Sequence, residues 1–224
     1  MYKALPSRGS QLSTLWWSLG SSAYYPHLFS ENLYHAFQFI FLDHRGFVKQ
    51  PRTLEPEDYN SAPTNSEARQ RQSFVFFNET ASPERKRQFE KDIALLESDI
   101  KKESERRFVH MCIRMGAQSF YDYTFNAAYM LEGVYTNMPI IDHLWGEAFG
   151  ELNLIQSLAS FNKPVFVGLG RYDYLVAPVS LWNSVDDTYE NVKKVIFEYS
   201  GHNPMFEEPQ SFDRELIKWV REGK

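Results

Sequence analysis

The chain has 224 residues and a formal net charge of -5; charged residues make up 24% of it and hydrophobic residues 43%. This is the composition of an ordinary soluble globular protein, with enough chain to bury a sizeable core. Its basic residues alternate with acidic ones, so no basic face indicates a nucleic-acid partner.

The cysteine content and the length of the apolar runs indicate the expected cellular location. A single cysteine, Cys112, excludes a disulfide within the chain, and its amphipathic surroundings (RRFVHMCIRM) favour a structural thiol over a nucleophile. No apolar run approaches the ~18 residues of a membrane span, and the first residues lack the apolar centre of a signal peptide. We therefore expect a cytoplasmic protein without a membrane partner.

The first third of the chain predicts two strands and a loop. Residues 12–18 (LSTLWWS) form a candidate short strand, and AYYPHLF then leads as a loop into a short helix. Residues 36–43 (AFQFIFLD) are almost continuously apolar, which is typical of a strand covered on both faces. Residues 48–66 are rich in Pro, Asn, Ser and Glu and predict a loop.

A mostly helical block follows, over residues 64–161. Ser82, Pro83 and Glu84 form a typical helix start, with a capping side chain, a proline in the first turn and an acid near the positive end. One apolar stripe then predicts a long helix, on Phe89, Ile93, Leu96 and Ile100. Further helices are expected over residues 106–116, 119–131 and 142–161.

The last third predicts strand, helix, strand and helix. The apolar runs 163–170 and 194–199 predict the strands, and residues 177–187 the helix between them. The closing helix is amphipathic, with its apolar face on Phe212, Leu216, Trp219 and Val220. This order implies a parallel sheet in an α/β fold. Asp173 and His202 follow the two strands, so an acid and a histidine are expected at one edge of the sheet.

These two turns resemble those of a known family. GRYDYLVAP and SGHNPMFEEP are similar to the acid and histidine turns of α/β-hydrolases, most of all to those of the proline iminopeptidase branch. FIFLDHRG resembles the Asp-x-Arg-Gly turn of that branch, and LGSSAYYPHL resembles the residues after its oxyanion loop. The resemblance implies a mostly parallel α/β-hydrolase-like sheet from residues 1–61 and 162–224, with an inserted helical cap at residues 62–161.

The same resemblance implies an activity and roles for particular residues. His202 would be the general base of a Ser-His-Asp mechanism and Asp173 the acid that orients it, with Gly20 and Ser21 in the oxyanion loop. The substrate would be a small peptide or another small molecule, and the reaction the release of an N-terminal residue such as proline. In that branch the cap supplies acids that hold the substrate amine, for which the candidates are Glu132, Glu147 and Glu151.

No cofactor and no metal are expected. The remaining histidines show no metal-ligand spacing with acids or cysteine. Gly168 and Gly170 are not followed by a third glycine that opens a helix, so they do not form a phosphate-binding loop.

The sequence departs from the family where the nucleophile should be. The motif Gly-x-Ser-x-Gly is absent, since Gly146 and Gly150 have its outer spacing but enclose no serine. After Gly46, the family's next strands and its serine turn have no counterpart, so the sheet is expected to be incomplete. Three explanations are open: a segment of the native protein is missing here, the chain is a deleted or engineered form, or it is a natural variant without catalysis. The function is accordingly either that of a serine hydrolase or that of an inactive relative serving as a binding or scaffold protein.

Overall fold

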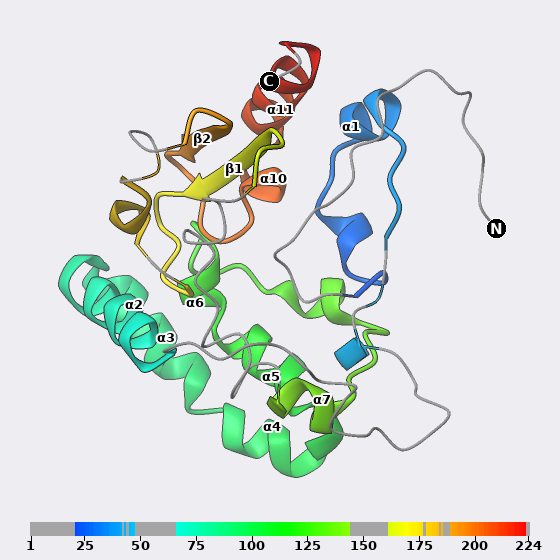
Figure 1. The fold of residues 1–224 in the computed structure, drawn as a ribbon. Coiled ribbons are helices and arrows are strands. Elements are labelled where there is room, and N and C mark those ends of the chain that lie inside the picture. Colours follow the sequence, from blue (N-terminus) through cyan, green and yellow to red (C-terminus); the bar gives the residue numbers. More distant parts are fainter. Residues whose placement is uncertain are drawn as a thin grey trace.

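The computed structural model describes residues 21–41, 43, 45–47, 66–143, 161–176, 178–183, 185 and 189–222 (Figure 1). The α-helices and the strands are α1 (Glu31–Ala36), α2 (Ser66–Thr80), α3 (Pro83–Ile93), α4 (Leu96–Lys102), α5 (Arg107–Arg114), α6 (Gly116–Ser119), α7 (Met138–His143), β1 (Val165–Gly170), β2 (Val192–Phe197), α10 (Pro204–Glu207) and α11 (Pro209–Glu222). Short 3-10 turns are η1 (Tyr25–His27), η2 (Arg45–Phe47), η4 (Ser104–Arg106), η5 (Ala127–Leu131) and η8 (Val179–Trp182). None of the described helices is both long and apolar enough to span a bilayer.

The two C-terminal strands confirm the expected parallel sheet. β1 and β2 pair in parallel, with Val165 opposite Val192 at one end and Gly170 opposite Phe197 at the other. Within the described residues the sheet has these two strands. Figure 1 shows both strands together with α10 and α11 in the upper part of the view, while α2 to α5 and α7 lie below them. The fold is therefore of the α/β class, with a small sheet.

Helix α11 covers the sheet through aromatic side chains, as its predicted apolar face requires. Phe212 is buried and packs against Phe166 of β1 and Phe197 of β2, with ring centroids 5.9 and 5.5 Å apart. The ring of Trp219 also contacts that of Phe166, with centroids 5.6 Å apart. A side chain at Gly168 would come within 3.2 Å of both Phe197 and Phe212, so the absence of a Cβ lets these rings close over the strand. The apolar contacts of this helix hold the end of the chain on the sheet.

The strand predicted over residues 36–43 is not formed in the described residues. Helix α1 extends to Ala36, Phe37 has an extended backbone, and residues 38–41 have no regular secondary structure. Phe37, Phe39 and Phe41 pack against the core, whereas Ile40 between them is 78% exposed. One face of this segment is thus covered and the other is open. The prediction was wrong because a strand needs neighbouring strands to take up its backbone hydrogen bonds, and none of the described residues supplies one.

The helical block opens with α2, which the sequence analysis did not specify, and the helix predicted to start at Ser82 follows as α3. Ser82 caps α3, accepting a hydrogen bond from the N–H of Arg85 at 3.2 Å, and Pro83 stands in its first turn. The single long helix expected on the apolar stripe is broken at Ala94 and Leu95 into α3 and α4. The helix expected over residues 106–116 is confirmed as α5.

The helix predicted over residues 119–131 is wrong for a reason visible in its hydrogen bonds. A continuing helix would join the carbonyl of Ala117 to the N–H of Tyr121. Instead the carbonyl of Ala117 accepts from the guanidinium of Arg85 at 2.7 Å, and the N–H of Tyr121 donates to the carboxylate of Glu207. Helix α6 therefore ends at Ser119, and the next helical turn, η5, begins only at residue 127.

Other predictions fall wholly or partly outside the described residues. These are the strand at residues 12–18, the loop at 48–66, the helix at 142–161 and parts of the helix at 177–187, whose described portion contains the short η8 turn. The main hydrophobic cluster joins residues of the predicted sheet domain, such as Leu33 and Phe212, to residues of the predicted cap, such as Met130. The division into core and cap stays a prediction.

Candidate active site

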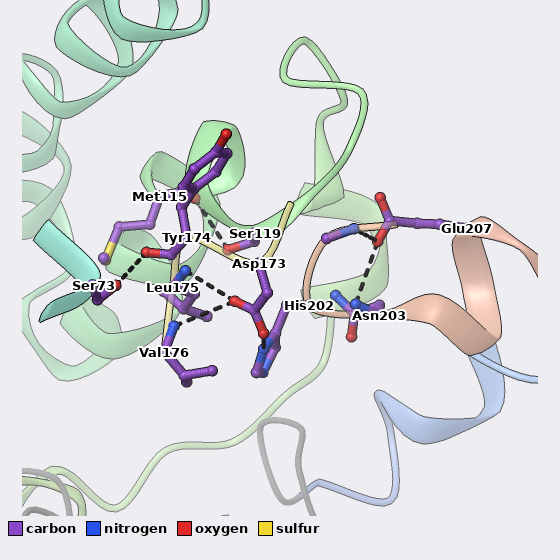
Figure 2. A network of polar contacts seen from close by, with 11 residues as sticks. Ser73, Met115, Ser119, Asp173, Tyr174, Leu175, Val176, His202, Asn203 and Glu207 are labelled. Carbon is purple, nitrogen blue, oxygen red and sulfur yellow. Dashed lines mark hydrogen bonds and ion pairs between the residues drawn. The ribbon is translucent and has the colours of Figure 1, made fainter. Parts of the chain in front are cut away.

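An acid and a histidine meet at the edge of the sheet where both strands end. Asp173 lies three residues after β1 and His202 five residues after β2. The Nδ1 atom of His202 is 2.8 Å from Oδ2 of Asp173 (Figure 2). Both side chains are largely buried, with 16% of the histidine and 14% of the aspartate exposed. Because parallel strands end at the same edge, the two groups meet although they are 29 positions apart in the sequence.

The backbone of its own turn sets the direction of the Asp173 carboxylate. Oδ1 accepts hydrogen bonds from the N–H groups of Leu175 at 2.9 Å and Val176 at 3.3 Å. This leaves Oδ2 for the imidazole. An ionised carboxylate only accepts hydrogen bonds, so the proton between the two groups belongs to Nδ1 of His202, and Nε2 of the neutral ring is an acceptor. The neutral ring is thus the Nδ1–H tautomer, in which Nε2 can act as a general base.

The electrostatic surroundings favour a charged imidazole. Burial lowers the pKa of His202, but the charge and hydrogen bond of Asp173, together with the charge of Glu207, outweigh it and raise the pKa above its ordinary value. A histidine that gains a proton readily and holds it beside a carboxylate can accept a proton from a hydroxyl and later return it to a leaving group.

Close backbone contacts join the two turns that carry the pair. The N–H of Arg171 donates to the carbonyl of Phe197 and that of Tyr172 to the carbonyl of Ser200, both at 2.9 Å. A Cβ atom at Gly170 would overlap the carbonyl of Gly201. A side chain at position 170 would therefore force the acid turn and the histidine turn apart.

A third turn, from the predicted cap, supports both of them. The N–H of His202 donates to the carbonyl of Ser119 at 2.6 Å, and the N–H of Tyr174 donates to the carbonyl of Gln118 at 3.0 Å. A Cβ at Gly201 would overlap the carbonyl of Ser119, so this approach depends on glycine. The α6 turn is thus part of the framework that places Asp173 and His202.

Two charged residues to which the sequence analysis gave no role hold this framework: Arg85, which is buried, and Glu207, which is partly buried. Arg85 donates to the carbonyls of Ala117 and Phe120, both at 2.7 Å, and to that of Tyr121 at 2.5 Å. Glu207, five residues after His202, accepts from backbone N–H groups of two turns: Tyr121 in one, and Gly201 and Asn203 in the other. Glu207 belongs to the histidine turn motif, but only the fold shows that its side chain folds back onto that turn.

The predicted oxyanion residues are only partly described. Ser21 is buried, and its carbonyl and hydroxyl both accept hydrogen bonds within its own turn. Gly20 lies outside the described residues. The neighbouring Ser22 donates from its N–H and its hydroxyl to the carboxylate of Asp43, at 2.6 and 2.8 Å. The two N-terminal stretches that resemble the family therefore lie side by side.

The predicted amine-binding acids are not brought to the pair in the described residues. Glu132 follows η5 with an exposed side chain, outside the hydrogen-bond network around His202. Glu147 and Glu151 lie outside the described residues. Their role in holding a substrate amine stays a prediction.

The serine nearest to the pair along the hydrogen-bond network is Ser119, and its hydroxyl is already engaged. It is buried and donates to the carbonyl of Met115 at 3.0 Å, as Figure 2 shows. Cys112 is the other conventional nucleophile, but burial raises the pKa of its thiol to about 12. No cluster of three potential metal ligands occurs in the part of the chain that the structure describes. The described residues thus contain the acid and the base, but neither Ser119 nor Cys112 is an activated nucleophile beside them.

Comparison with known proteins finds a relative over most of the chain. The sequence is 47% identical to the AB hydrolase superfamily protein YclE of Bacillus subtilis (strain 168), covering 90% of each chain. The alignment extends over 252 residues, more than the 224 of this chain, so the relative carries residues there that have no counterpart here. This agrees with the expected absence of a family segment. No protein-family profile matches the sequence.

Solved structures with some similarity are more distant. An esterase (EaEST) from Exiguobacterium antarcticum is 17% identical, with a TM-score of 0.41, over 59% of this chain and 48% of that one. A proline iminopeptidase from Mycobacterium smegmatis is 14% identical, with a TM-score of 0.46, over 72% and 55%. VinJ is 14% identical, with a TM-score of 0.43, over 73% and 56%. The chain spans about half the length of each of these structures.

Proposed function

The chain belongs to the α/β-hydrolase superfamily, and from this membership we propose that it is a hydrolase in which His202 is the general base and Asp173 its orienting acid. The observation that carries the proposal is the 2.8 Å contact between Nδ1 of His202 and Oδ2 of Asp173 at the edge of the parallel sheet. This geometry leaves Nε2 of the ring as the atom that removes a proton.

The proposed chemistry is acyl transfer to a serine hydroxyl, on a serine that the sequence does not identify because it contains no Gly-x-Ser-x-Gly motif. A hydroxyl attacks a carbonyl carbon only as its proton leaves, and Nε2 of His202 would accept that proton. Asp173 would stabilise the imidazolium so formed, and its proton would pass to the leaving amine as the C–N bond breaks. Water, deprotonated in turn by His202, would then attack the serine ester and release the acyl group. Backbone N–H groups of the Gly20–Ser21 loop would stabilise the oxyanion.

For the substrate, we propose a small peptide that loses its N-terminal residue, such as proline. The support is the likeness of the two C-terminal turns and of the Asp43–Gly46 turn to those of proline iminopeptidases. An acid in the helical block would bind the free amine, with Glu132, Glu147 and Glu151 as candidates.

A second function is favoured by one specific observation, the absence of Gly-x-Ser-x-Gly from the sequence. On this alternative the chain keeps the acid and histidine turns of its family but has lost catalysis, and serves as a binding or scaffold protein. In that case His202 and Asp173 stabilise the edge of the sheet and take no part in chemistry.

One experiment separates the two functions. The protein is treated with a fluorophosphonate probe, assayed on prolyl and alanyl arylamides, and any labelled residue is mapped by mass spectrometry. For a hydrolase we expect one labelled serine, and loss of labelling and turnover in His202→Ala. His35→Ala is the matched control, because this exposed histidine bonds only to its own helix among the described contacts.

The absence of labelling and of turnover would contradict the hydrolase function. A protein that folds, does not react with the probe and does not hydrolyse either arylamide is not a serine hydrolase of this kind. The intact mass of the protein from its native source completes the test. A mass well above 26.3 kDa would show that the native protein contains chain that is missing here.

A further inference from the structure

The carboxylate of Glu207 collects backbone N–H groups from two turns that are distant in sequence. Oε2 accepts from Gly201 at 2.9 Å and from Asn203 at 3.3 Å, and Oε1 accepts from Tyr121. Figure 2 shows Glu207 beside Asn203, with dashed lines to the backbone of the histidine turn. Three backbone donors thus bind one carboxylate, and such charge-assisted hydrogen bonds restrict the conformation of the turns that supply them.

These contacts enclose His202 on both sides. The N–H groups of residues 201 and 203 go to Glu207, and the N–H between them, that of His202 itself, goes to the carbonyl of Ser119. Three successive backbone donors are therefore held by tertiary partners. The backbone position of His202 sets where its ring lies, because a histidine side chain has only two rotatable bonds.

We propose that Glu207 is a positioning residue of the acid–histidine pair: its carboxylate clamps the 201–203 turn to the 119–121 turn and so keeps His202 within hydrogen-bond reach of Asp173. The inference rests on the proposed hydrolase function for its catalytic consequence, but not for its structural one. Glu207 touches neither the substrate nor the reacting atoms in this role.

The charges around Glu207 link the clamp to the state of the pair. The charged or titratable groups that act on it are Asp173 of the acid turn, His202 of its own turn and Arg85 of α3. Burial raises the pKa of Glu207 to about 7 against the lowering effect of its three backbone donors, and the charge of Asp173 adds to the rise. When ionised, Glu207 in turn favours the protonated imidazole of His202.

The neighbouring residue provides a matched control. Glu208 accepts from the N–H of Tyr199 at 2.8 Å and from the hydroxyl of Ser200 at 2.7 Å. It thus bonds the same loop one step earlier, without holding the residues on either side of His202. Glu207→Gln and Glu208→Gln both replace one carboxylate oxygen by a donor NH₂ group, which cannot accept from a backbone N–H.

The test measures the titration of the His202 ring by NMR in the wild type and in both variants, beside their urea unfolding curves. We expect Glu207→Gln to lower the pKa of His202 by about half a unit or more, since an anionic neighbour and the fixed contact to Asp173 are both weakened. Glu208→Gln should leave it unchanged. If Glu207→Gln does not fold, Glu207→Asp, which keeps the charge but is one methylene shorter, replaces it, with a smaller shift expected.

Steady-state kinetics give the second readout wherever the wild type turns over an arylamide. Glu207→Gln should lower kcat at least about tenfold with little change in KM, because misplacement of the base affects the chemical step and not binding. Equal losses of stability in both variants, with the His202 titration and kcat unaltered, would reduce Glu207 to a structural residue and overturn the proposal. A wild type without turnover contradicts the hydrolase function alone, because the NMR titration still decides the role of Glu207.

Discussion

Arg85 and Glu207 bind the two backbone polar groups of one residue, Tyr121. The guanidinium of Arg85 donates to the carbonyl of Tyr121, and the N–H of Tyr121 donates to the carboxylate of Glu207. Arg85 comes from the start of α3, in the helical block, and Glu207 from the end of α10, beside the sheet. A buried guanidinium and a partly buried carboxylate therefore join the helical block to the segment beside the sheet through the backbone of Tyr121, next to the turn that bears His202.

The first prediction concerns the buried guanidinium. Arg85→Met keeps the apolar stem but leaves the carbonyls of Ala117, Phe120 and Tyr121 without their donor. We expect the free energy of unfolding to fall by about 3 kcal/mol or more, since each buried unpaired group costs about 1–3 kcal/mol. Urea denaturation measures this loss.

Arg87→Met is the control for that substitution. Arg87 lies on the same helix but pairs with Glu84 at the surface, where its side chain is 65% exposed. Such pairs contribute at most about 0.5 kcal/mol. Similar losses for the two variants would show that the carbonyl contacts of Arg85 do not stabilise the fold.

The second prediction concerns the acid of the pair. Asp173→Asn retains an oxygen for the N–H groups of Leu175 and Val176, but presents an amide NH₂ to the imidazole. The ring must then accept at Nδ1, and its pKa should fall, because the charge and hydrogen bond that raise it are lost. Hydrolysis, where present, should drop on the order of 10³–10⁴-fold, as expected when a histidine base takes the wrong tautomer.

The NMR titration of His202 and the rate of arylamide cleavage both report this change. Glu198→Gln is the control, because it breaks the exposed ion pair with Arg171 at the same edge of the sheet. An Asp173→Asn protein whose His202 titrates as in the wild type would contradict the assigned pair.

The third prediction is a loss of stability as the pH rises from about 5 to 8. Glu207 and His202 both have raised pKa values in the folded protein, the former to about 7. A group with a raised pKa binds its proton more tightly when folded, so its stabilisation is complete below the unfolded pKa and is lost as the pH passes through the folded pKa. For Glu207 this window runs from its ordinary 4.5 to about 7 and involves about 1–3 kcal/mol.

Glu84 and Asp122 behave in the opposite way, since hydrogen bonds lower their pKa values. Their contributions are present above their ordinary pKa values and disappear in acid, outside the window of Glu207 and His202. Urea unfolding at pH 5, 6, 7 and 8 tests the prediction. A profile that is flat in this range in the wild type, or equally steep in Glu207→Gln, would contradict it.

The fourth prediction separates two glycines that are needed for different reasons. Gly201→Ala places a Cβ against the carbonyl of Ser119, so the histidine turn must move away from α6. We expect a loss of about 1–3 kcal/mol in unfolding free energy, together with an altered His202 titration.

Gly133→Ala is the comparison. Gly133 has a positive φ of 75° and open space around the new methyl group, so only backbone strain of about 1 kcal/mol is expected. Its effect on the His202 titration should be negligible. If Gly201→Ala left that titration intact, the close approach of the two turns would not be what positions the ring.

Local sequence patterns were sufficient to predict the elements whose conformation depends mainly on neighbouring residues. They are the N-cap of α3, the two apolar strand runs and the amphipathic face of α11. The acid and the histidine that follow the strands belong with them, because parallel strands joined by a crossover end at one edge of the sheet. The remaining features depend on contacts between residues that are far apart in the sequence. Phe37, Phe39 and Phe41 form no strand in the described residues because a ladder needs partners. The chain after Ser119 leaves the helix because Arg85 and Glu207, distant in sequence, take the backbone groups that a helix would use.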